Sequence, residues 1–414
     1  MIEYCLNYYE DFVQECKTKR ILCIGYDHTF NSDKRELLSG FIKKIDYWVT
    51  YEEFFSSPFE ENSSIVSISF ERLNAIDLNE YVFLIISDYV DYMKIKLKEL
   101  VSDDTYVKCY TYKFAYRDYY DEKKLKSNRL DKVAMYWYQY YLTHVLEIQQ
   151  KEQLITKREH ALCKNEIRVI PRLVVVLTTK CNLSCKDCIA LTTHYKHPYD
   201  IPADIIIKSL EKITKVIDEC ICVELIGGEP FMYKYLPQVL RYLKNHSKIK
   251  FIQITTNGIV FDYNNEYKEL LTGNVMVRVS DYSISDNTNE FVSWLKSNKI
   301  HHTVQKDLVW IPVADVSDKN KKSQDKKDEY NLCFEGLHCK TLLKGVLYDC
   351  TFSSRICDLG YAEQCQIIDV LKERVTWERL FRYWIRNESN ACSYCNIMNP
   401  NTELVKSARQ KNDK

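Results

Sequence analysis

Short apolar runs that alternate with amphipathic stretches mark the first part of the chain. Residues 21–26 and 81–87 are largely aliphatic or aromatic over the length of one strand, and such runs predict buried strands. A further strand is expected over 107–114, and the apolar residues within 93–100 predict a helix after the second strand. Strands that alternate with helices predict a small Rossmann-like α/β domain over residues 1–165.

The pattern becomes a regular repeat in the middle of the chain. A long, tyrosine-rich helix is expected near residues 134–160 as the link between two domains. Residues 173–177 form an aliphatic run, and amphipathic helices are predicted over 204–218 and 235–245, with strands between and after them. A strand–helix repeat of this kind predicts a parallel sheet. Residues 166–312 are therefore expected to form one α/β domain.

Charged residues dominate the stretch 317–329, which predicts a solvated linker or a mobile loop. The expected domains after the sheet are accordingly a charged linker over 313–331, a small cysteine-rich domain over 332–400 and a tail over 401–414.

Composition narrows the class of protein. Lys+Arg and Asp+Glu number 58 each, and this balance gives no reason to expect a nucleic acid or a membrane surface as partner. The apolar runs are too short to span a bilayer, and the N-terminal residues lack the apolar core of a signal peptide. We expect a cytoplasmic protein of two or three domains from 414 residues.

The 17 cysteines point to metal or redox chemistry, because a cytoplasmic protein rarely uses a disulfide framework. Cys181, Cys185 and Cys188 follow the run 173–177 with the spacing C-x3-C-x2-C. Three thiolates so close on one loop can bind three irons of a 4Fe–4S cluster and leave the fourth iron open. The alternative is a zinc site or scattered core thiols, but zinc usually needs a fourth ligand, and none lies close by.

Glycine is scarce, with 9 residues in the whole chain, and three of them, Gly227, Gly228 and Gly258, fall at predicted strand ends. A chain this poor in glycine is expected to keep it where the backbone approaches a ligand or takes a positive φ. Three ordinary turns are the alternative.

From the three cysteines onward, the sequence resembles the radical SAM enzymes. Their C-x3-C-x2-C signature is followed in order by a GGEP motif within 224–230, a strand with a TNG end at 252–258, and a strand with a polar tip at 277–281. The likeness covers about residues 170–310. It departs from the family at Asp187, where many members have an aromatic residue before the third cysteine.

The resemblance implies a partial (β/α) barrel with its cofactors at the C-terminal ends of the strands, as in barrel enzymes generally. The S-adenosylmethionine (SAM) contacts that it implies come from Gly227, Gly228 and Glu229 for the methionine amine, and from Asn257, Ser280 and Asp281 for the ribose. An electron from the reduced cluster, supplied by a partner such as flavodoxin or ferredoxin, would cleave SAM. The 5′-deoxyadenosyl radical would then take a hydrogen atom from substrate, while the protein supplies geometry and excludes competing reactions.

A second group of cysteines lies in the C-terminal part and includes Cys333, Cys339, Cys350, Cys392 and Cys395. The Gly345-x4-Cys350 step predicts a hairpin turn with a ligand on the returning strand, and a helix is expected near 377–385. The arrangement resembles the twitch domain, the shorter relative of the SPASM domain, which implies an auxiliary 4Fe–4S cluster. Its implied ligands are Cys350, Cys392 and Cys395, with either Cys339 or Cys333 as the fourth. A structural zinc is the alternative.

Cys357 and Cys365 remain as spare thiols, either hydrogen-atom donors for an epimerisation or buried structural residues.

Gly25 stands without a G-x-G-x-x-G fingerprint, so the N-terminal domain is expected to serve docking, substrate positioning or dimerisation rather than to bind a nucleotide. We expect a small-molecule or sugar-like substrate that is oxidised or epimerised. The alternatives are a maturase acting on a peptide or protein and, outside enzymes, an iron–sulfur electron-transfer partner.

Overall fold

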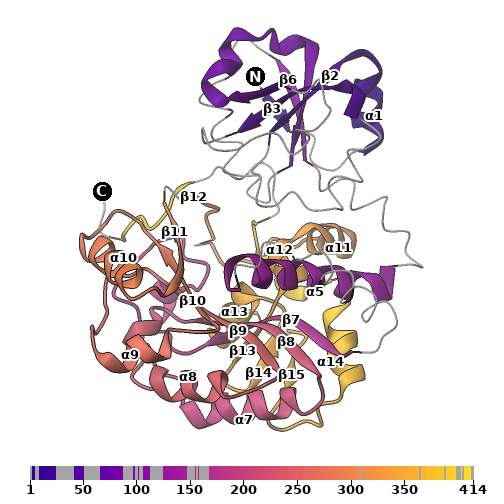
Figure 1. The fold of residues 1–414 in the computed structure, drawn as a ribbon. Coiled ribbons are helices and arrows are strands. Elements are labelled where there is room, and N and C mark those ends of the chain that lie inside the picture. The colour runs from indigo at the N-terminus through magenta and orange to yellow at the C-terminus, as the bar shows by residue number, and fades with distance from the viewer. Residues whose placement is uncertain are drawn as a thin grey trace. The chain divides into compact units, whose positions relative to one another are not determined.

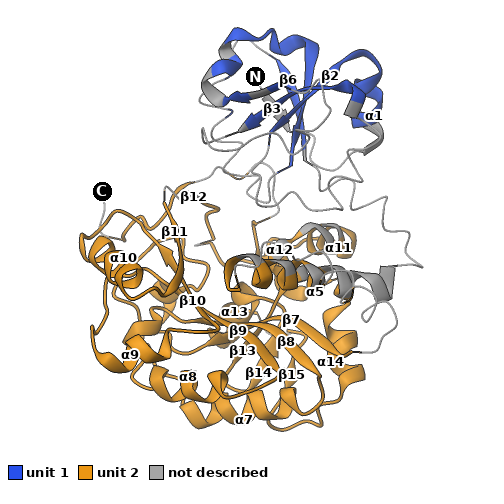
Figure 2. Ribbon diagram, in the orientation of Figure 1, with its two compact units in different colours: residues 1–122 blue, residues 123–414 orange. Residues whose placement is uncertain are grey.

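The computed structural model forms two compact units, residues 1–122 and 123–414 (Figure 2). The residues it describes are 2–4, 9–24, 42–50, 66–86, 97, 101, 106–111, 125–146, 154, 157 and 167–411, the last range with gaps at 307–308, 314, 363–364, 387, 398–401 and 403–404.

Unit 1 is built on a six-stranded sheet in the order β1-β6-β5-β2-β3-β4, with every strand pair parallel. Its described elements are β1 (Ile2–Tyr4), α1 (Tyr9–Thr18), β2 (Arg20–Ile24), η2 (Ile42–Lys44), β3 (Ile45–Thr50), β4 (Val66–Ser69), η3 (Phe70–Ala75), η4 (Leu78–Glu80), β5 (Tyr81–Ile85) and β6 (Val107–Thr111). Leu22 and Ile24 of β2 pack into one apolar cluster, and Ile21 and Cys23 into another. Both faces of the sheet are thus buried, which explains its continuous apolar runs.

Three of these strands, β2, β5 and β6, lie where the apolar runs predicted them, whereas β1, β3 and β4 were not predicted. The helix expected over 93–100 lies outside the described residues apart from Leu97.

Unit 2 contains an eight-stranded sheet in the order β11-β10-β9-β8-β7-β13-β14-β15 (Figure 1). The pairs among β7 to β11 and the pair of β13 with β7 are parallel, while β14 and β15 join as antiparallel strands. The strands are β7 (Val169–Val176), β8 (Glu219–Ile226), β9 (Ile249–Thr256), β10 (Val275–Ser280), β11 (His301–Gln305), β13 (Lys340–Leu343), β14 (Val346–Tyr348) and β15 (Ile368–Asp369). The runs over 173–177, 252–258 and 277–281 correspond to β7, β9 and β10.

Helices cover both faces of this sheet. The helices α7 (Ala203–Thr214), α8 (Leu236–Lys244), α9 (Asn265–Leu270) and α10 (Asn287–Ser297) bury residues in one apolar core with the strands. The helix α5 (Leu125–His144) packs Val133 and Trp137 against Phe251 and Met276 in a separate cluster. Figure 1 shows α7 and α8 on one side of the sheet and α5 on the other. The long helix expected near 134–160 therefore starts earlier and packs on the sheet of unit 2.

The C-terminal part contains α11 (Ser323–Leu332), α12 (Phe334–His338), α13 (Thr351–Asp358), α14 (Trp377–Trp384) and η8 (Asn390–Tyr394). The prediction of a linker over 313–331 is wrong from residue 323 onward, because α11 packs against α12 and η8. Its Tyr330 is only 2% exposed, and Glu329 pairs with Lys321 at 2.7 Å. Because the segment has one buried aromatic residue among charged ones, it lacks the apolar stripe with helical spacing from which a helix could have been predicted.

The end of the described chain returns to the sheet domain. A small antiparallel pair joins β12 (Val309–Trp310) to β16 (Val405–Lys406), and residues 407–411 continue toward the cysteine loop. Short 3-10 turns lie at η6 (Thr192–His194) and η7 (Pro230–Met232).

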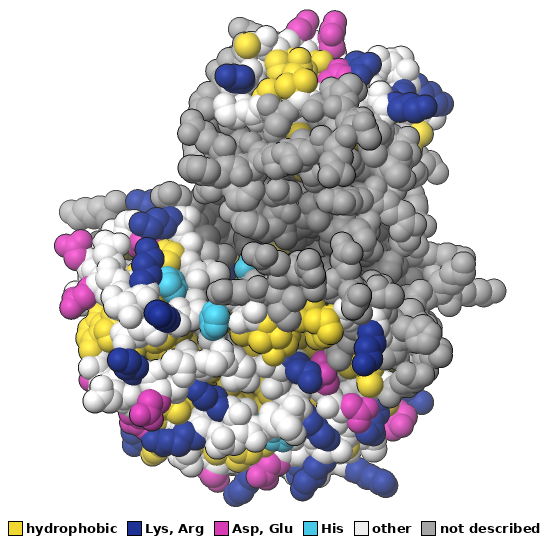
Figure 3. Space-filling model, in the orientation of Figure 1, with side chains coloured by type: hydrophobic (Ala, Val, Ile, Leu, Met, Phe, Trp, Pro, Cys, Tyr) yellow, Lys and Arg dark blue, Asp and Glu magenta, His cyan; other side chains and the backbone are white. Residues whose placement is uncertain are grey.

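Acidic and basic side chains are interspersed on the face of unit 2 that Figure 3 presents, in keeping with the balanced charge. Within the described residues, no helix has the length and apolar character needed to cross a membrane.

Candidate active site

The ends of β7 and β8 continue as a backbone ladder beyond the sheet. Leu177 N donates to Ile226 O at 2.8 Å, Gly228 N to Thr178 O at 2.9 Å, and Glu229 N to Lys180 O at 2.8 Å. The glycine-rich turn after β8 is therefore fastened to the residues that lead directly into Cys181. This contact joins two motifs that lie far apart in the sequence.

Glycine is required in that turn for steric reasons. A Cβ on Gly228 would lie 2.1 Å from Lys180 O and 2.8 Å from the Cβ of Cys181, and one on Gly227 would lie 2.9 Å from Thr178 O. Gly258 has a φ of +70°, in the region that glycine enters without strain. The positive φ expected among these glycines is found at Gly258, whereas Gly227 and Gly228 lie against the chain's own backbone; that their backbone also approaches a ligand stays a prediction.

Glu229 is 1% exposed and fixes the turn. Its carboxylate accepts hydrogen bonds from Thr256 Oγ1 at 2.7 Å, Asn257 N at 2.9 Å and Phe231 N at 3.1 Å. Burial raises the pKa of Glu229 to about 7, although these three bonds lower it. A carboxylate has about four acceptor positions, so Glu229 mainly ties the turn after β8 to the turn after β9 and keeps about one acceptor position for a ligand.

Asn257 connects the same site to the cysteine loop. Its Nδ2 donates to Asn182 Oδ1 at 2.8 Å, and its Oδ1 accepts from Ile259 N at 2.9 Å. Ser280 and Asp281 are buried at the end of β10, where Asp281 Oδ1 accepts from Ser283 N at 2.9 Å and Asp281 Oδ2 lies 3.3 Å from Lys306 Nζ. The predicted polar residues thus stand at the ends of neighbouring parallel strands.

The three signature cysteines share one electrostatic environment. Burial raises the pKa of Cys181 to about 12 and of Cys185 to about 11, and the other cysteines of the loop act in the same direction. Their mutual influence and their thiol chemistry fit the ligand set of a 4Fe–4S cluster. Since a metal binds the thiolate, loading a cluster would have to release the protons that burial holds on Cys181 and Cys185.

A row of charged and polar side chains runs across neighbouring strands on one face of the sheet. The sequence analysis did not predict it. Arg172 of β7 forms a buried ion pair with Glu224 of β8, and Glu224 also accepts from Thr255 Oγ1 at 2.6 Å and Gln253 Nε2 at 2.9 Å. Burial alone would raise the pKa of Glu224, but Arg172 and Arg278 outweigh it and hold that pKa below its usual value. Charged residues within apolar strands are the sequence signal that could have indicated this row.

Arg355 of α13 is a second residue that the sequence did not single out. It is 0% exposed, and its Nη2 lies 3.4 Å from Gly227 O. Its Nε and Nη1 have no hydrogen-bond partner among the residues that the structure describes. A fully buried guanidinium therefore stands beside the glycine-rich turn with unused donors.

The C-terminal cysteines separate into two groups. The charge of Cys333 contributes to raised pKa values at Cys350, Cys392 and Cys395, although burial is the largest cause at each. Cys339 instead donates to Glu335 O at 3.2 Å and to Glu335 Oε2 at 3.3 Å within α12 and its C-cap. The charge of Cys350 in turn contributes to the raised pKa of Cys339, although burial is again the largest cause. In the described part of the chain, no group of three or more His, Cys, Asp or Glu side chains is placed so that it could hold a metal ion.

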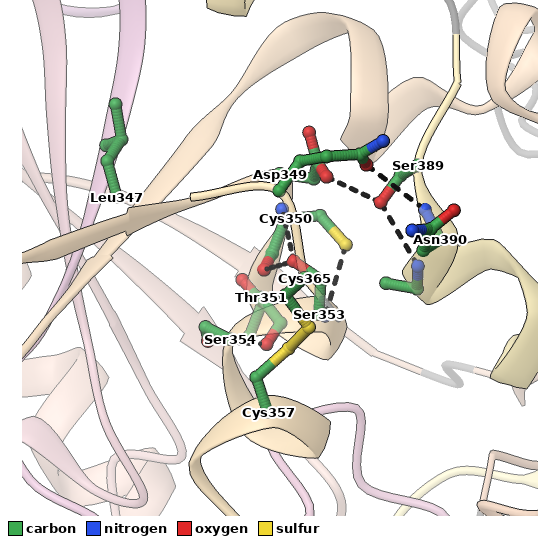
Figure 4. The surroundings of a disulfide bond; sticks show 12 residues. Leu347, Asp349, Cys350, Thr351, Ser353, Ser354, Cys357, Cys365, Ser389 and Asn390 are labelled. Carbon is green, nitrogen blue, oxygen red and sulfur yellow. Dashed lines mark hydrogen bonds between the residues drawn. A yellow bond between two sulfur atoms is a disulfide. The ribbon is translucent and has the colours of Figure 1, made fainter. Parts of the chain in front are cut away.

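The predicted hairpin is present, with the turn Lys344–Gly345 at φ values of 52° and 81°. Cys350 lies just beyond the returning strand, at the N-cap of α13, where its Sγ accepts from Ser353 N at 3.4 Å. The preceding Asp349 bonds to Ser389, the N-cap of η8 (Figure 4). This bond fastens the Cys350 turn to the turn that carries Cys392.

Cys357 and Cys365 form a disulfide in the structure (Figure 4). The expectation that they are spare thiols is corrected in this form of the protein, because a disulfide carries no S–H group to give up. The bond closes the end of α13 onto the loop that follows it.

Together these features define a strand-end site in a parallel α/β sheet, with a cysteine loop fastened to a glycine-rich turn. Residues 175–292 match the model of the Radical SAM superfamily, so this part of the chain is a radical SAM domain.

Curated relatives match within a limited length. A probable GTP 3',8-cyclase of Methanococcus maripaludis is 36% identical over 90 residues, covering 21% of this chain and 28% of that protein. A 7,8-dihydro-6-hydroxymethylpterin dimethyltransferase of Methanocaldococcus jannaschii is 27% identical over 109 residues, covering 26% and 21%. The chain thus spans less than a third of the length of these relatives.

Two solved structures show weak similarity. BtrN in complex with AdoMet and 2-DOIA has a TM-score of 0.36 and 12% identity, covering 55% of this chain and 87% of that chain. Streptococcus suis SuiB bound to S-adenosylmethionine has a TM-score of 0.34 and 14% identity, covering 61% and 80%.

Proposed function

We propose that the protein is a radical SAM enzyme that uses a 4Fe–4S cluster on Cys181, Cys185 and Cys188. The observation that carries this proposal is the backbone ladder that fastens the Gly227–Gly228 turn to the start of the cysteine loop. With SAM bound, the cluster supplies the electron that yields methionine and a 5′-deoxyadenosyl radical, which takes a hydrogen atom from substrate.

The roles of the surrounding residues follow from their placement. The turn from Gly227 to Glu229 would receive the methionine amine, since Glu229 keeps an acceptor position and stays rigid through its three bonds. Asn257, Ser280 and Asp281 would bind the ribose. Tyr282, whose raised pKa arises from burial and from the charge of Cys188, lies near the loop and would help to exclude water.

We further propose an auxiliary 4Fe–4S cluster on Cys333, Cys350, Cys392 and Cys395. The Asp349–Ser389 bond that holds two of the turns together supports the set, as does the contribution of Cys333 to the raised pKa values of the other three thiols. Cys339, whose thiol donates to Glu335, is the alternative fourth ligand. A structural zinc on the same four thiolates is the competing assignment.

Iron analysis of Cys333→Ala and Cys339→Ala separates these choices. Cys333→Ala should lose about four irons per chain, the content of one cluster, while Cys339→Ala keeps them. The reverse result would transfer the ligand role to Cys339. Zinc recovered in stoichiometric amount from protein prepared without oxygen would replace the auxiliary cluster by a structural metal.

For the chemistry after hydrogen abstraction, we propose oxidation of a small-molecule or sugar-like substrate, with the auxiliary cluster as electron acceptor. The Cys357–Cys365 disulfide favours oxidation over epimerisation, since neither sulfur holds a hydrogen atom to return. A peptide or protein maturase remains the second candidate. Offering deuterated sugars and peptides and following deuterium into 5′-deoxyadenosine distinguishes the two.

The first test needs no substrate. Protein reconstituted without oxygen is mixed with SAM and dithionite, and 5′-deoxyadenosine is quantified. Steady formation in the wild type and none in Cys185→Ala is the expected result. Equal formation by both proteins would refute the assignment of the first cluster. Two reducible clusters without any SAM cleavage would favour an electron-transfer protein.

A further inference from the structure

The last described residues of the chain lie against the cysteine loop. Lys186 N donates to Arg409 O at 2.8 Å, and Lys411 N donates to Ser184 O at 2.9 Å. Cys185, the middle cysteine, forms an isolated antiparallel bridge with Gln410. The backbone on both sides of Cys185 is therefore held by the tail, in the manner of a short strand pair.

The side chain of Gln410 contacts the loop with both ends of its amide. Its Oε1 accepts from Ser184 N at 2.7 Å, and its Nε2 donates to Cys185 Sγ at 3.3 Å and to Ala408 O at 2.6 Å. The Ser184 and Ala408 bonds fix the direction of the amide, so a donor stays aimed at the sulfur.

Arg409 adds a charged anchor. Its Nη2 lies 2.7 Å from Asp187 Oδ2, and Asp187 is only 6% exposed. Asp187 is also the residue at which the loop departs from the radical SAM pattern. The acid that replaces the usual aromatic residue thus has a partner in this chain's own tail.

Three further contacts hold the tail in place. Its strand β16 pairs with β12, and Trp310 of β12 stacks edge-on against Tyr282 with ring centroids 5.5 Å apart. Lys411 Nζ donates to Thr193 O at 2.9 Å. Ala408 of the tail is only 3% exposed.

We propose that residues 405–411 act as a clamp on the cysteine loop, and that Gln410 is a positioning residue that raises the reduction potential of the cluster bound there. This inference rests on the proposed function. A hydrogen bond to a ligating sulfur withdraws electron density from it, which stabilises the reduced, more negative cluster. An amide donor to Cys185 therefore makes the first electron easier to accept.

The clamp has a second effect on the free protein. Because Ser184, Cys185 and Lys186 are already held by the tail, the loop loses less conformational entropy when the cluster binds. Weakening the clamp should therefore speed the loss of iron as well as lower the potential.

The test uses full-length protein, reconstituted without SAM, and two variants of Gln410. Gln410→Leu removes the whole amide, while Gln410→Glu keeps an oxygen for Ser184 N and replaces the donor by a carboxylate. Potentiometric titration followed by EPR should show the first cluster shifted to more negative potential in both, and further in Gln410→Glu because of its charge. Lys208→Met, which removes an exposed ion pair with Asp204 on α7 and touches neither the tail nor the cysteine loop, is the matched control and should leave the potential unchanged.

Iron release to a chelator provides the second measurement. Arg409→Met should release iron about fivefold faster than the wild type, the factor expected for the loss of one hydrogen bond. Gln410→Leu, which removes three hydrogen bonds of the amide, should release iron at least as fast as Arg409→Met. A Gln410→Leu protein that cannot hold the first cluster at all also supports the clamp, provided that Lys208→Met holds it.

The clamp is refuted if both Gln410 variants keep the wild-type potential and the wild-type rate of iron release. A wild-type protein that binds no cluster at the three cysteines would instead refute the proposed function itself. The two failures are therefore distinguishable in a single set of samples.

Discussion

Arg172 and Arg355 are both buried guanidinium groups, but their surroundings differ. Arg172 donates through Nε to Glu224 Oε2 at 2.8 Å and lies over the ring of Trp137, 4.9 Å from its centroid. Arg355 has one long hydrogen bond, to Gly227 O, and its guanidinium lies over the ring of Tyr195, 5.8 Å from the centroid. Arginine stays charged in proteins, so the two residues should respond in opposite ways to the same substitution.

Arg172→Met should destabilise the protein by about 3–5 kcal/mol, because it leaves Glu224 buried without its counter-charge. Arg355→Met should be neutral or stabilising in the ligand-free protein, because it removes a buried charge that lacks full hydrogen bonding. Thermal unfolding of the two variants beside the wild type measures this contrast. Equal losses would show that Arg355 is paired in solution.

Glu229 should make the free energy of unfolding depend on pH. Its pKa is raised by burial from 4.5 to about 7, so between these values the folded state binds the proton more tightly than the unfolded chain. The proton on Glu229 therefore stabilises the folded state fully below about pH 4.5. This stabilisation is lost as the pH rises through 7 and amounts to about 3 kcal/mol of unfolding free energy in total.

Glu229→Gln should remove this loss, because glutamine is neutral throughout the range. The difference in unfolding free energy between cluster-free wild type and Glu229→Gln should therefore change by about 3 kcal/mol in favour of the variant between pH 4.5 and 7.5. Denaturant titrations at several pH values supply the measurement. A difference that stays constant with pH would mean that Glu229 keeps its ordinary pKa.

At the scale of elements, the turn after β8 has no room for a side chain at Gly228. Gly228→Ala should prevent the turn from seating against Lys180 and so cost the iron of the first cluster, since the blocking atoms are backbone. Gly273→Ala is the control, because nothing lies within 4 Å of its added methyl group and only its φ of +73° opposes alanine, by about 1–2 kcal/mol. Iron content after reconstitution compares the two. Full iron in Gly228→Ala would show that the turn can move.

The sequence predicted the elements whose own apolar residues indicate that they are buried. The runs behind β7, β9 and β10 were placed correctly, and Gly227, Gly228 and Gly258 follow the ends of β8 and β9; that these strand ends form the cofactor site stays a prediction. The pairing of β13 with β7 was not predictable, since Lys340 and Leu173 stand opposite each other although they are far apart in the chain. A local pattern records that a segment is buried but not which partner buries it.

At the scale of the whole molecule, the residues proposed to hold the two clusters both lie in unit 2. If both proposed clusters form, the wild type should bind about eight irons per chain, and the triple variant Cys181→Ala, Cys185→Ala, Cys188→Ala should keep about four. Iron and sulfide analysis with the visible spectrum measures this. Loss of all eight in the triple variant would mean that the second site depends on the first.

The contacts that escaped prediction at this scale all span long stretches of chain. Arg355 reaches Gly227, and Arg409 reaches Asp187, from segments whose local sequence gives no sign of a target. The sequence of the tail is polar and shows no helical or strand periodicity. Its contact with the cysteine loop could therefore be recognised only in the structure.

The contact of the tail with the cysteine loop also orders events during synthesis. Gln410 is 226 residues later in the chain than Ser184, so a ribosome adding about 5–20 residues per second needs roughly 10–45 s to pass from one to the other. Throughout that interval the loop exists without its cover. The loop is thus made earlier than the tail that contacts it, and if the proposed cluster and clamp both form, this interval would let the cluster be delivered before the clamp closes.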